Sequence, residues 1–149
     1  MYDFAYSRPT SLKDAQAALA KAGDDGVFLA GGQSLIPALK LRLRRPAAVV
    51  DLGGLPGLDQ IVAEGDRLVI GALATHAAVA TSKTVREKIP ALAALAGGIG
   101  DPQVRNRGTL GGSIANADPA ADYPAAVVGL DAEVVTDKRT IKADDFFPG

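Results

Sequence analysis

Residues 28–39, FLAGGQSLIPAL, run from apolar residues through two glycines into apolar residues at helical spacing. This order predicts a strand, a tight turn at Gly31-Gly32 and a helix that begins near Gln33-Ser34. The first N–H groups of a helix have no partner within it, and the helix dipole favours an anion there. Glycine permits positive φ and lets a phosphate oxygen approach without meeting a Cβ. Two alternatives stay open on this stretch alone: a phosphate-binding loop, or a turn that needs glycine only for its geometry.

The sequence on either side of this stretch predicts a small βαβ lobe over residues 1–52. Thr10 or Ser11 is suited to cap the first helix, and Gly23 is suited to end it. Pro37 falls in the first turn of the second helix, where its missing N–H does no harm. A strand, a helix and a further strand in this order favour parallel pairing. The predicted elements are helices at 12–22 and 34–45 and strands at 26–30 and 47–52.

The remainder, residues 53–149, predicts a second α/β lobe. Two apolar runs around a Glu-Gly-Asp turn in residues 58–72 are typical of a β-hairpin. The pattern of residues 75–100 predicts two helices, which are separated by a break just before Pro90. Residues 101–124 lack an amphipathic pattern, and a long irregular segment in a compact domain is usually functional or disordered. The last predicted elements are a short helix at 125–130 and strands at 132–136 and 139–147, before a turn at Pro148-Gly149.

The composition excludes several classes of protein. The 149 residues include no cysteine and one histidine, His76, and the net charge is −1. The lack of cysteine excludes disulfides, thiolate nucleophiles and iron–sulfur ligation by this chain, and one histidine does not make an ordinary zinc site. A near-neutral charge gives no electrostatic reason to expect nucleic acid as a partner, and no apolar run reaches the length of a membrane span. We expect a cytoplasmic protein with no metal ligand, in which any redox chemistry uses a bound organic cofactor.

A second glycine stretch, RGTLGGS at residues 107–113, repeats the features of the first. A glycine pair, Gly111-Gly112, again precedes a small polar residue, Ser113. Two such loops could hold the two phosphates of a dinucleotide through backbone N–H groups. Neither is a Walker loop, because no lysine follows the glycines. The segment GGIGDPQ at residues 97–103 is not a Rossmann fingerprint either, because Gln103 stands where the third glycine of G-x-G-x-x-G belongs.

Polar side chains near the second stretch have both a ligand and a structural interpretation. Asn116, Asp118 and Asp122 could bond sugar or ribityl hydroxyls. Asp118 precedes Pro119, which favours a turn role, and Asp122 is alternatively a helix cap. Arg105 and Arg107 could meet phosphate, although solvated positions are favoured for both, and a surface or capping position is favoured over catalysis for His76.

Two long motifs, AGGQSLIPALKLRL at 30–43 and IGDPQVRNRGTLGGSIANADPAADYPAA at 99–126, resemble the FAD-binding medium subunits of the molybdenum hydroxylases. The resemblance is greatest to carbon monoxide dehydrogenase medium subunits and extends to the flavin domain of xanthine dehydrogenase. Residues 2–19 and 45–58 are similar to the same family, so that the resemblance covers essentially the whole chain. It implies an α/β (α+β) fold, a two-lobed FAD-binding domain of the type shared with xanthine dehydrogenase and vanillyl-alcohol-oxidase-like flavoproteins.

The resemblance also implies a site, with FAD extended between the lobes and its pyrophosphate on both glycine loops. Ile99 matches a position near the flavin, and Asp122 matches an acid that bonds the cofactor. Gln33 departs from the histidine that carbon monoxide dehydrogenases of the family often have there, so the motif gives no support to carbon monoxide as the substrate. The implied cofactor-binding residues are Ala30, Gly31, Gly32, Gln33, Ser34, Leu35, Ile99, Thr109, Leu110, Gly111, Gly112, Ser113 and Asp122.

For function, the resemblance implies an oxidoreductase subunit that passes electrons from partner iron–sulfur clusters through FAD to an external acceptor. The implied partners are a large molybdopterin-binding subunit, where substrate is oxidised, and a small [2Fe–2S] subunit, in a dimer of heterotrimers. Family members have a further C-terminal domain after the aromatic pair that matches Phe146-Phe147, and we expect this chain to lack it. One alternative is therefore an assembly module of the same complex that does not hold FAD productively. A nucleotide-binding enzyme of another kind is a third and disfavoured alternative.

Overall fold

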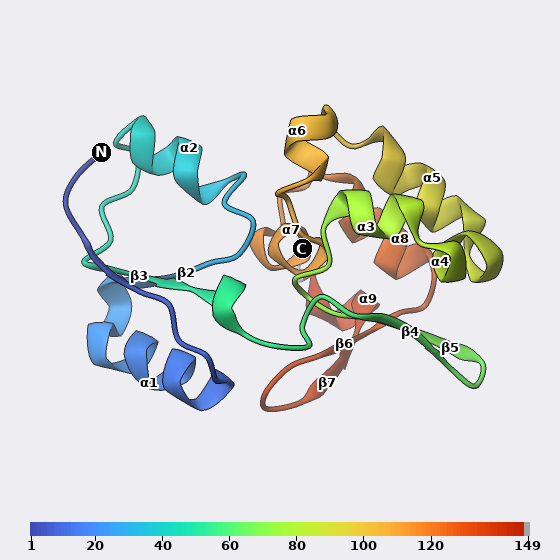
Figure 1. The fold of residues 1–149 in the computed structure, drawn as a ribbon, viewed down its shortest axis with the longest axis horizontal. Helices are drawn as coiled ribbons and strands as arrows, with labels where there is room; N and C mark the ends of the chain where they lie inside the picture. Colours follow the sequence, from blue (N-terminus) through green and yellow to red (C-terminus); the bar gives the residue numbers. More distant parts are fainter. Residues whose placement is uncertain (148–149) are drawn as a thin grey trace.

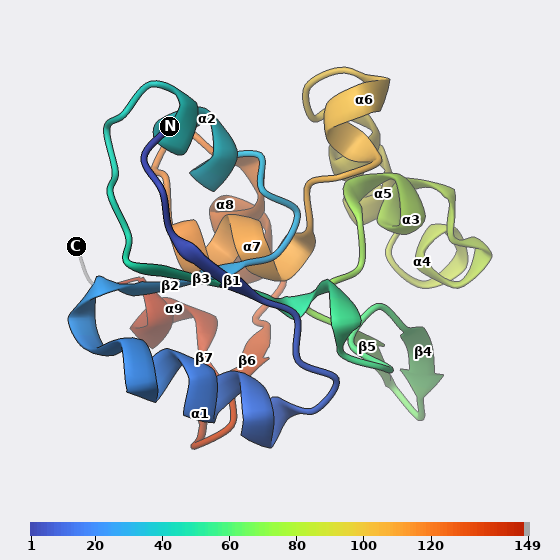
Figure 2. The same ribbon diagram turned by 60° about the vertical axis from the view of Figure 1, so that its left-hand side comes forward.

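The computed structural model describes residues 1–147, and the predicted turn at 148–149 lies outside them. Residues 1–52, here called the N-terminal lobe, form a three-stranded parallel sheet in the order β1-β3-β2. Helix α1 packs against β2 and β3 on one face of this sheet, and α2 lies over the other face (Figures 1 and 2). The elements are β1 (Ala5–Ser7), α1 (Leu12–Ala22), β2 (Gly26–Leu29), α2 (Leu35–Lys40) and β3 (Ala48–Asp51).

The parallel pairing and both predicted strands of this lobe are confirmed, and so is the first helix. The hydroxyl of Ser11 caps α1 by accepting from the N–H of Asp14 (3.1 Å), and Gly23 ends the helix at φ 62°. The predicted second helix over 34–45 was too long, because the chain turns after Lys40 and Arg42 adopts a φ of 59°. Strand β1 was not predicted, since its three side chains are all exposed and give no apolar signal.

The part of the chain after residue 52, here called the second lobe, begins with the expected hairpin (Figure 1). Strands β4 (Ile61–Glu64) and β5 (Arg67–Ile70) pair antiparallel around the Gly65 turn. Three short helices follow where two were predicted: α3 (His76–Thr81), α4 (Lys83–Lys88) and α5 (Pro90–Gly98). The additional break lies at Ser82, whose extended backbone (φ −58°, ψ 123°) places its hydroxyl to cap α4 at Val85 N–H. The division of the chain at residue 52 stays a prediction.

The segment over 101–124, which has no amphipathic pattern, folds into two short helices and the start of a third. The predicted helix at 125–130 begins earlier, at Asp122, and the predicted strand at 139–147 is wrong after Lys142 because the chain turns into a short helix there. Strands β6 and β7 pair as a second antiparallel hairpin. The elements are α6 (Pro102–Arg105), α7 (Leu110–Asn116), α8 (Asp122–Gly129), β6 (Glu133–Val135), β7 (Thr140–Lys142) and α9 (Ala143–Phe146).

Two apolar clusters stabilise the fold. The smaller cluster lies between α1 and the parallel sheet around Ala15, Val50 and Leu55, and the larger joins helices α3, α4, α5, α7 and α8 of the second lobe. Tyr123 and Val79 in the larger cluster are fully buried. Within residues 1–147 no helix has the length and apolar character needed to cross a membrane.

Candidate cofactor site

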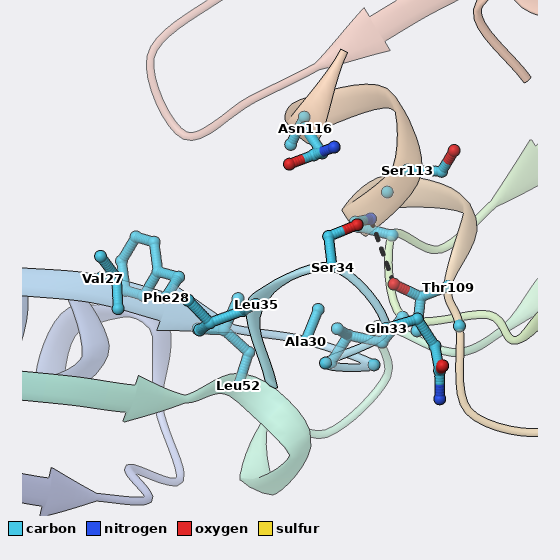
Figure 3. A pocket seen from close by; sticks show the side chains of 18 of the residues that line it. Val27, Phe28, Ala30, Gln33, Ser34, Leu35, Leu52, Thr109, Ser113 and Asn116 are labelled. Carbon is cyan, nitrogen blue, oxygen red and sulfur yellow. Dashed lines mark hydrogen bonds between the residues drawn. The ribbon is translucent and has the colours of Figure 1, made fainter. Parts of the chain in front are cut away.

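A cavity of about 790 Å³ lies where the N-terminal lobe meets the second lobe. Strand β2, the loop after it and the start of α2 form one wall, and the chain from Gly108 through α7 forms the other (Figure 3). Its volume falls in the range of roughly 300–1,000 Å³ that is usual for sites of small molecules and cofactors. The strand-to-helix turn of residues 28–39 therefore forms part of a cavity wall.

The first glycine loop, defined here as residues 30–35, leaves its backbone donors free. No backbone or side-chain oxygen within residues 1–147 accepts a hydrogen bond from the N–H groups of residues 31–35. The first bond of the α2 turn is formed by Ile36, whose N–H donates to Gly32 O at 2.9 Å, and Ser34 forms no side-chain cap. Since these residues line the cavity, five consecutive N–H groups are available to an anionic ligand.

The glycine pair of this loop is required by the geometry of the protein itself. Gly32 has a φ of 78°, in the region that favours glycine. Gly31 packs against the other lobe: a Cβ at this position would lie 2.8 Å from the Cα of Gly108 and would collide with the carbonyl group of Arg107. The pair is therefore needed both for the turn and for close backbone contact across the lobes.

The second glycine loop, residues 109–113, uses its donors inside the protein. The N–H groups of Leu110 and Gly111 donate to the carbonyls of Ala74 (3.0 Å) and Ala72 (2.8 Å). Thr109 is the N-cap of α7, and its Oγ1 accepts from the N–H of Gly112 at 3.1 Å (Figure 3). The N–H of the next residue, at position 113, donates to the carbonyl of Thr109 (3.0 Å). The N–H groups of residues 110–113 are therefore not free to bind a ligand, and this loop can contact a ligand mainly through its side chains.

Crowding accounts for the glycines of the second loop. A Cβ on Gly111 would lie 2.6 Å from the carbonyl oxygen of Ala72, and a Cβ on Gly112 would lie 2.7 Å from Thr109 Oγ1 and 3.5 Å from the Cβ of Ala30. Backbone and capping atoms of the protein occupy the space that side chains would need. The crowding at these two positions therefore comes from the second lobe itself, and the first loop is only in ordinary contact through Ala30.

The structure brings most of the predicted site residues to the cavity and leaves two away from its lining. Leu110 is buried in the apolar core of the second lobe, and Asp122 is the first residue of α8, whose N-cap is Ala121 and not Asp122. The capping role considered for Asp122 is therefore wrong, and a cofactor role for these two residues and the others stays a prediction. The predicted residues that line the cavity are Ala30, Gly31, Gly32, Gln33, Ser34, Leu35, Ile99, Thr109, Gly111, Gly112 and Ser113.

The remaining polar candidates near the second loop divide between structural and ligand positions. The carboxylate of Asp118 accepts from the N–H of Ala120 (2.9 Å), which confirms its turn role, and Asp118 also lines the cavity together with Asn116. Arg105 is structural, because its Nη1 donates to the carbonyls of Ile99 (3.0 Å) and Gly100 (3.2 Å). Within residues 1–147 no three His, Cys, Asp or Glu side chains gather as metal ligands.

His76 was assigned wrongly to a surface or capping position. The residue is buried at the start of α3, where the cap is Thr75, and it is among the residues that line the cavity. Its ring centroid lies 5.2 Å from that of Tyr123. Burial lowers the pKa of His76 and raises that of Tyr123, so both groups are neutral near pH 7. No local sequence signal marked this pair, because residue 76 and residue 123 meet only through tertiary packing.

Sequence reasoning also missed the apolar side of the cavity. Val27, Phe28 and Leu52 lie beside Leu35 at one side of the view, away from Ser113 and Asn116 (Figure 3). The exposed fraction of Phe28 is 42%, which is high for an aromatic residue in a strand and is the signal that separates it from a core position. Arg44, at the end of the connection that follows α2, adds a cation to the lining.

Over residues 2–149 the chain matches the family described as the FAD binding domain in molybdopterin dehydrogenase. The chain belongs to this family, which confirms the FAD-binding fold and FAD as the cofactor. Medium subunits of dehydrogenase complexes are among its relatives: the nicotine 6-hydroxylase medium subunit of Paenarthrobacter nicotinovorans is 42% identical over 148 residues, 97% of this chain and 52% of the relative. The carbon monoxide dehydrogenase medium chain of Hydrogenophaga pseudoflava is 42% identical over 150 residues, 98% of this chain and 52% of the relative.

Solved structures agree with this assignment. Carbon monoxide dehydrogenase from Hydrogenophaga pseudoflava superposes with a TM-score of 0.96 at 42% identity, over 99% of this chain and 53% of that one. Quinoline 2-oxidoreductase from Pseudomonas putida 86 superposes with a TM-score of 0.89 at 36% identity, over 95% of this chain and 51% of that one. The chain spans about half the length of these relatives.

Proposed function

We propose that the cavity binds FAD across the two lobes and that the first glycine loop holds its pyrophosphate. The observation that carries the proposal is the row of N–H groups at residues 31–35, which have no protein acceptor in the described part of the chain and line the cavity. Backbone N–H groups at a strand-to-helix turn are the usual protein donors for phosphate oxygens. Arg44 adds a positive charge to the same cavity.

The two rings of FAD require apolar surface on either side of the pyrophosphate. Val27, Phe28 and Leu52 offer it on the N-terminal lobe, and Ile99 offers it on the second lobe. We place the flavin toward Ile99 and the adenine toward Phe28. In the second loop, the hydroxyl of Ser113 and the amide of Asn116 are side-chain donors for sugar or ribityl oxygens.

In a complex, the protein would pass electrons from iron–sulfur clusters of one partner to an external acceptor. FAD supplies this chemistry when bound, because it takes up and releases electrons, and the chain binds and orients it. We assign no catalytic residue to the chain. The proposed partners are a large molybdopterin-binding subunit and a small [2Fe–2S] subunit in a dimer of heterotrimers, and a cytoplasmic location belongs to the same proposal.

The choice of substrate lies outside this domain in our proposal. Relatives named for nicotine, carbon monoxide and quinoline all share it, although their named substrates differ greatly in chemistry. A domain common to such enzymes supplies what they have in common, which is the flavin.

Hydrogen exchange of the purified protein with and without FAD tests the proposal. We expect FAD to slow exchange at the amides of residues 31–35 by at least about tenfold, since they gain acceptors, while the amides of 110–113 are protected already. FMN, which lacks the pyrophosphate and adenine, is the matched ligand and should protect less. Bound FAD without protection at 31–35 would contradict the placement of the pyrophosphate. No FAD binding at all would favour an assembly module.

A further inference from the structure

A buried polar pair, His76 and Tyr123, lies directly behind the second wall of the cavity. The exposed fraction of His76 is 5% and that of Tyr123 is 0%. Neither Nδ1 of His76 nor the hydroxyl of Tyr123 has a hydrogen-bond partner within residues 1–147, although the two rings lie 5.2 Å apart at an interplanar angle of 45°. Two buried polar atoms without partners on neighbouring rings are unusual, because each costs free energy unless a water or a ligand satisfies it.

The two nitrogens of the imidazole face different surroundings. Nδ1 is the nitrogen that is buried without a partner. The opposite edge of the ring, which carries Nε2 and Cδ2, lies against Gly108 so closely that a Cβ there would be 2.8 Å from Cδ2. Both Gly108 and His76 line the cavity. The ring therefore lies between the buried tyrosine and a backbone segment that lines the cavity.

The backbone around this ring is fixed from both sides. The peptide N–H of His76 donates to the carbonyl of Gly108 at 3.0 Å, and Gly31 of the first loop packs on the other side of Gly108. A layer of Gly31, Gly108, His76 and Tyr123 thus runs from the first glycine loop into the core. The bond between the His76 N–H and Gly108 ties the start of α3 to the segment that lines the cavity.

We propose that His76 is a cofactor contact: the hydroxyl of Tyr123 donates through one buried water to Nδ1 and so holds the tautomer whose Nε2–H donates to an oxygen of the bound dinucleotide. The proposal rests on FAD binding in this cavity. It satisfies both unpartnered atoms, since the tyrosine hydroxyl gains an acceptor and Nδ1 gains a donor. The lowered pKa of His76 agrees with it, because burial keeps the imidazole neutral. Tyr123 is a positioning residue, as it does not line the cavity.

Tyr123→Phe separates this role from packing. If the hydroxyl has no function, its removal eliminates an unpaired buried polar group, and the stability of the protein should stay the same or rise. In that case the affinity for FAD should also stay unchanged. We expect the opposite on both counts: the melting temperature without FAD should fall, because Nδ1 of His76 loses its donor, and FAD affinity should fall by about 3- to 10-fold. Tyr6→Phe is the control: Tyr6 is exposed, bonds Asp51 at 2.6 Å and lies outside the cavity lining, so FAD affinity should not change.

Substitutions of His76 test which nitrogen acts. The amide nitrogen of glutamine reaches close to the place of Nε2, and that of asparagine reaches only to the place of Nδ1. We expect His76→Gln to keep FAD affinity within about threefold and His76→Asn to lose at least about tenfold. Equal losses in the two variants would assign His76 to packing and overturn the proposal.

The tautomer is directly observable, because His76 is the only histidine in the sequence. Two-bond ¹H–¹⁵N spectra should show a protonated Nε2 and an unprotonated Nδ1 in the wild type with FAD, and a mixture of tautomers in Tyr123→Phe. A protonated Nδ1 in the wild type would overturn the proposal. If the wild type binds no FAD, the proposed function fails. If it binds FAD and neither Tyr123→Phe nor the two His76 variants change affinity, only this inference fails.

Discussion

The first glycine loop, residues 30–35, and the second, residues 109–113, both place a glycine pair before a small hydroxyl residue at the start of a short helix. Their backbone donors differ. In the first loop the N–H groups of residues 31–35 have no acceptor within residues 1–147, whereas in the second the N–H groups of residues 110–113 all donate to protein oxygens. The free donors of the first loop support the anion-binding role proposed for it, whereas the second loop uses its donors to fix its own backbone against residues 72 and 74 of the same lobe. Similar motifs thus have different roles, which follow from where the hydrogen bonds go.

Replacing Gly111 by alanine should have the largest effect, and it should act on stability. The new Cβ would lie 2.6 Å from the carbonyl oxygen of Ala72 and 2.5 Å from its Cβ, and backbone cannot yield as a flexible side chain can. We expect a loss of about 3 kcal/mol in the free energy of unfolding, measured by urea denaturation without FAD.

Gly98→Ala is the matched control for this substitution. Gly98 lies in α5 with no atom within 4 Å of its Cβ position, so alanine there should be neutral or should stabilise by about 0.5–1 kcal/mol. A Gly111→Ala protein as stable as the wild type would show that the second loop is not the close contact described.

Adding a carboxylate to each loop tests which one binds the pyrophosphate. Ser34→Asp places a negative charge among the free N–H groups and should weaken FAD binding by about 10- to 100-fold through like-charge repulsion. Without FAD it should leave the melting temperature unchanged or slightly higher, because aspartate is a good N-cap. Equilibrium titration of FAD by flavin fluorescence measures the affinity.

Ser113→Asp is the comparison in the second loop. The N–H of Ser113 already donates to the carbonyl of Thr109, so we expect FAD affinity to fall by less than about fivefold. A larger loss at residue 113 than at residue 34 would move the pyrophosphate to the second loop.

Removing the side-chain oxygen at the start of each helix should give a smaller difference in stability between the two loops. Thr109→Val keeps the shape of the side chain but removes the oxygen that accepts from Gly112, and should cost about 1 kcal/mol of stability. Ser34→Ala should change stability by less than about 0.5 kcal/mol, since the Ser34 hydroxyl forms no cap bond. Thermal unfolding without FAD measures both, and equal costs would contradict the assigned difference in capping.

Local pattern predicted the parts of the fold that depend on near neighbours. Gly23 ends α1 and the 58–72 segment forms a hairpin because turn residues and alternation are sequence signals. Strand β1 could not be found in this way, because its exposed Ala-Tyr-Ser segment is a strand only by pairing with β3. The break at Ser82, by contrast, is a local feature that the prediction missed, because the serine hydroxyl caps α4 three residues on.

The candidate site shows the same limit. The glycine motifs identified both loops, because a glycine pair before a helix marks a tight turn or a close backbone approach. The motifs could not show that the second loop uses its N–H groups internally, since the acceptors on Ala72 and Ala74 lie some 40 residues earlier in the chain. They also could not show that His76 is buried, because Tyr123 and Gly108 cover it only in the folded protein.

The smallest predicted effect is a pH dependence that reports whether the layer behind the second loop is dry. Burial lowers the pKa of His76 in the folded protein, whereas the unfolded chain keeps a pKa near 6.5. Between these two values the unfolded state binds a proton that the folded state does not. The free energy of unfolding should therefore decrease as the pH falls below about 6.5. Above this pH the contribution of His76 to the free energy of unfolding should be constant.

Thermal melts between about pH 5 and 8, compared with His76→Gln, isolate this contribution, because the sequence has no other histidine. The variant should lose the slope below about pH 6.5 and keep only that of the carboxylates at lower pH. Identical slopes in the two proteins would mean that the folded state takes up the proton as readily as the unfolded one, so that water reaches the imidazole. In that case the second loop would be an open wall and not the closed packing that distinguishes it from the first.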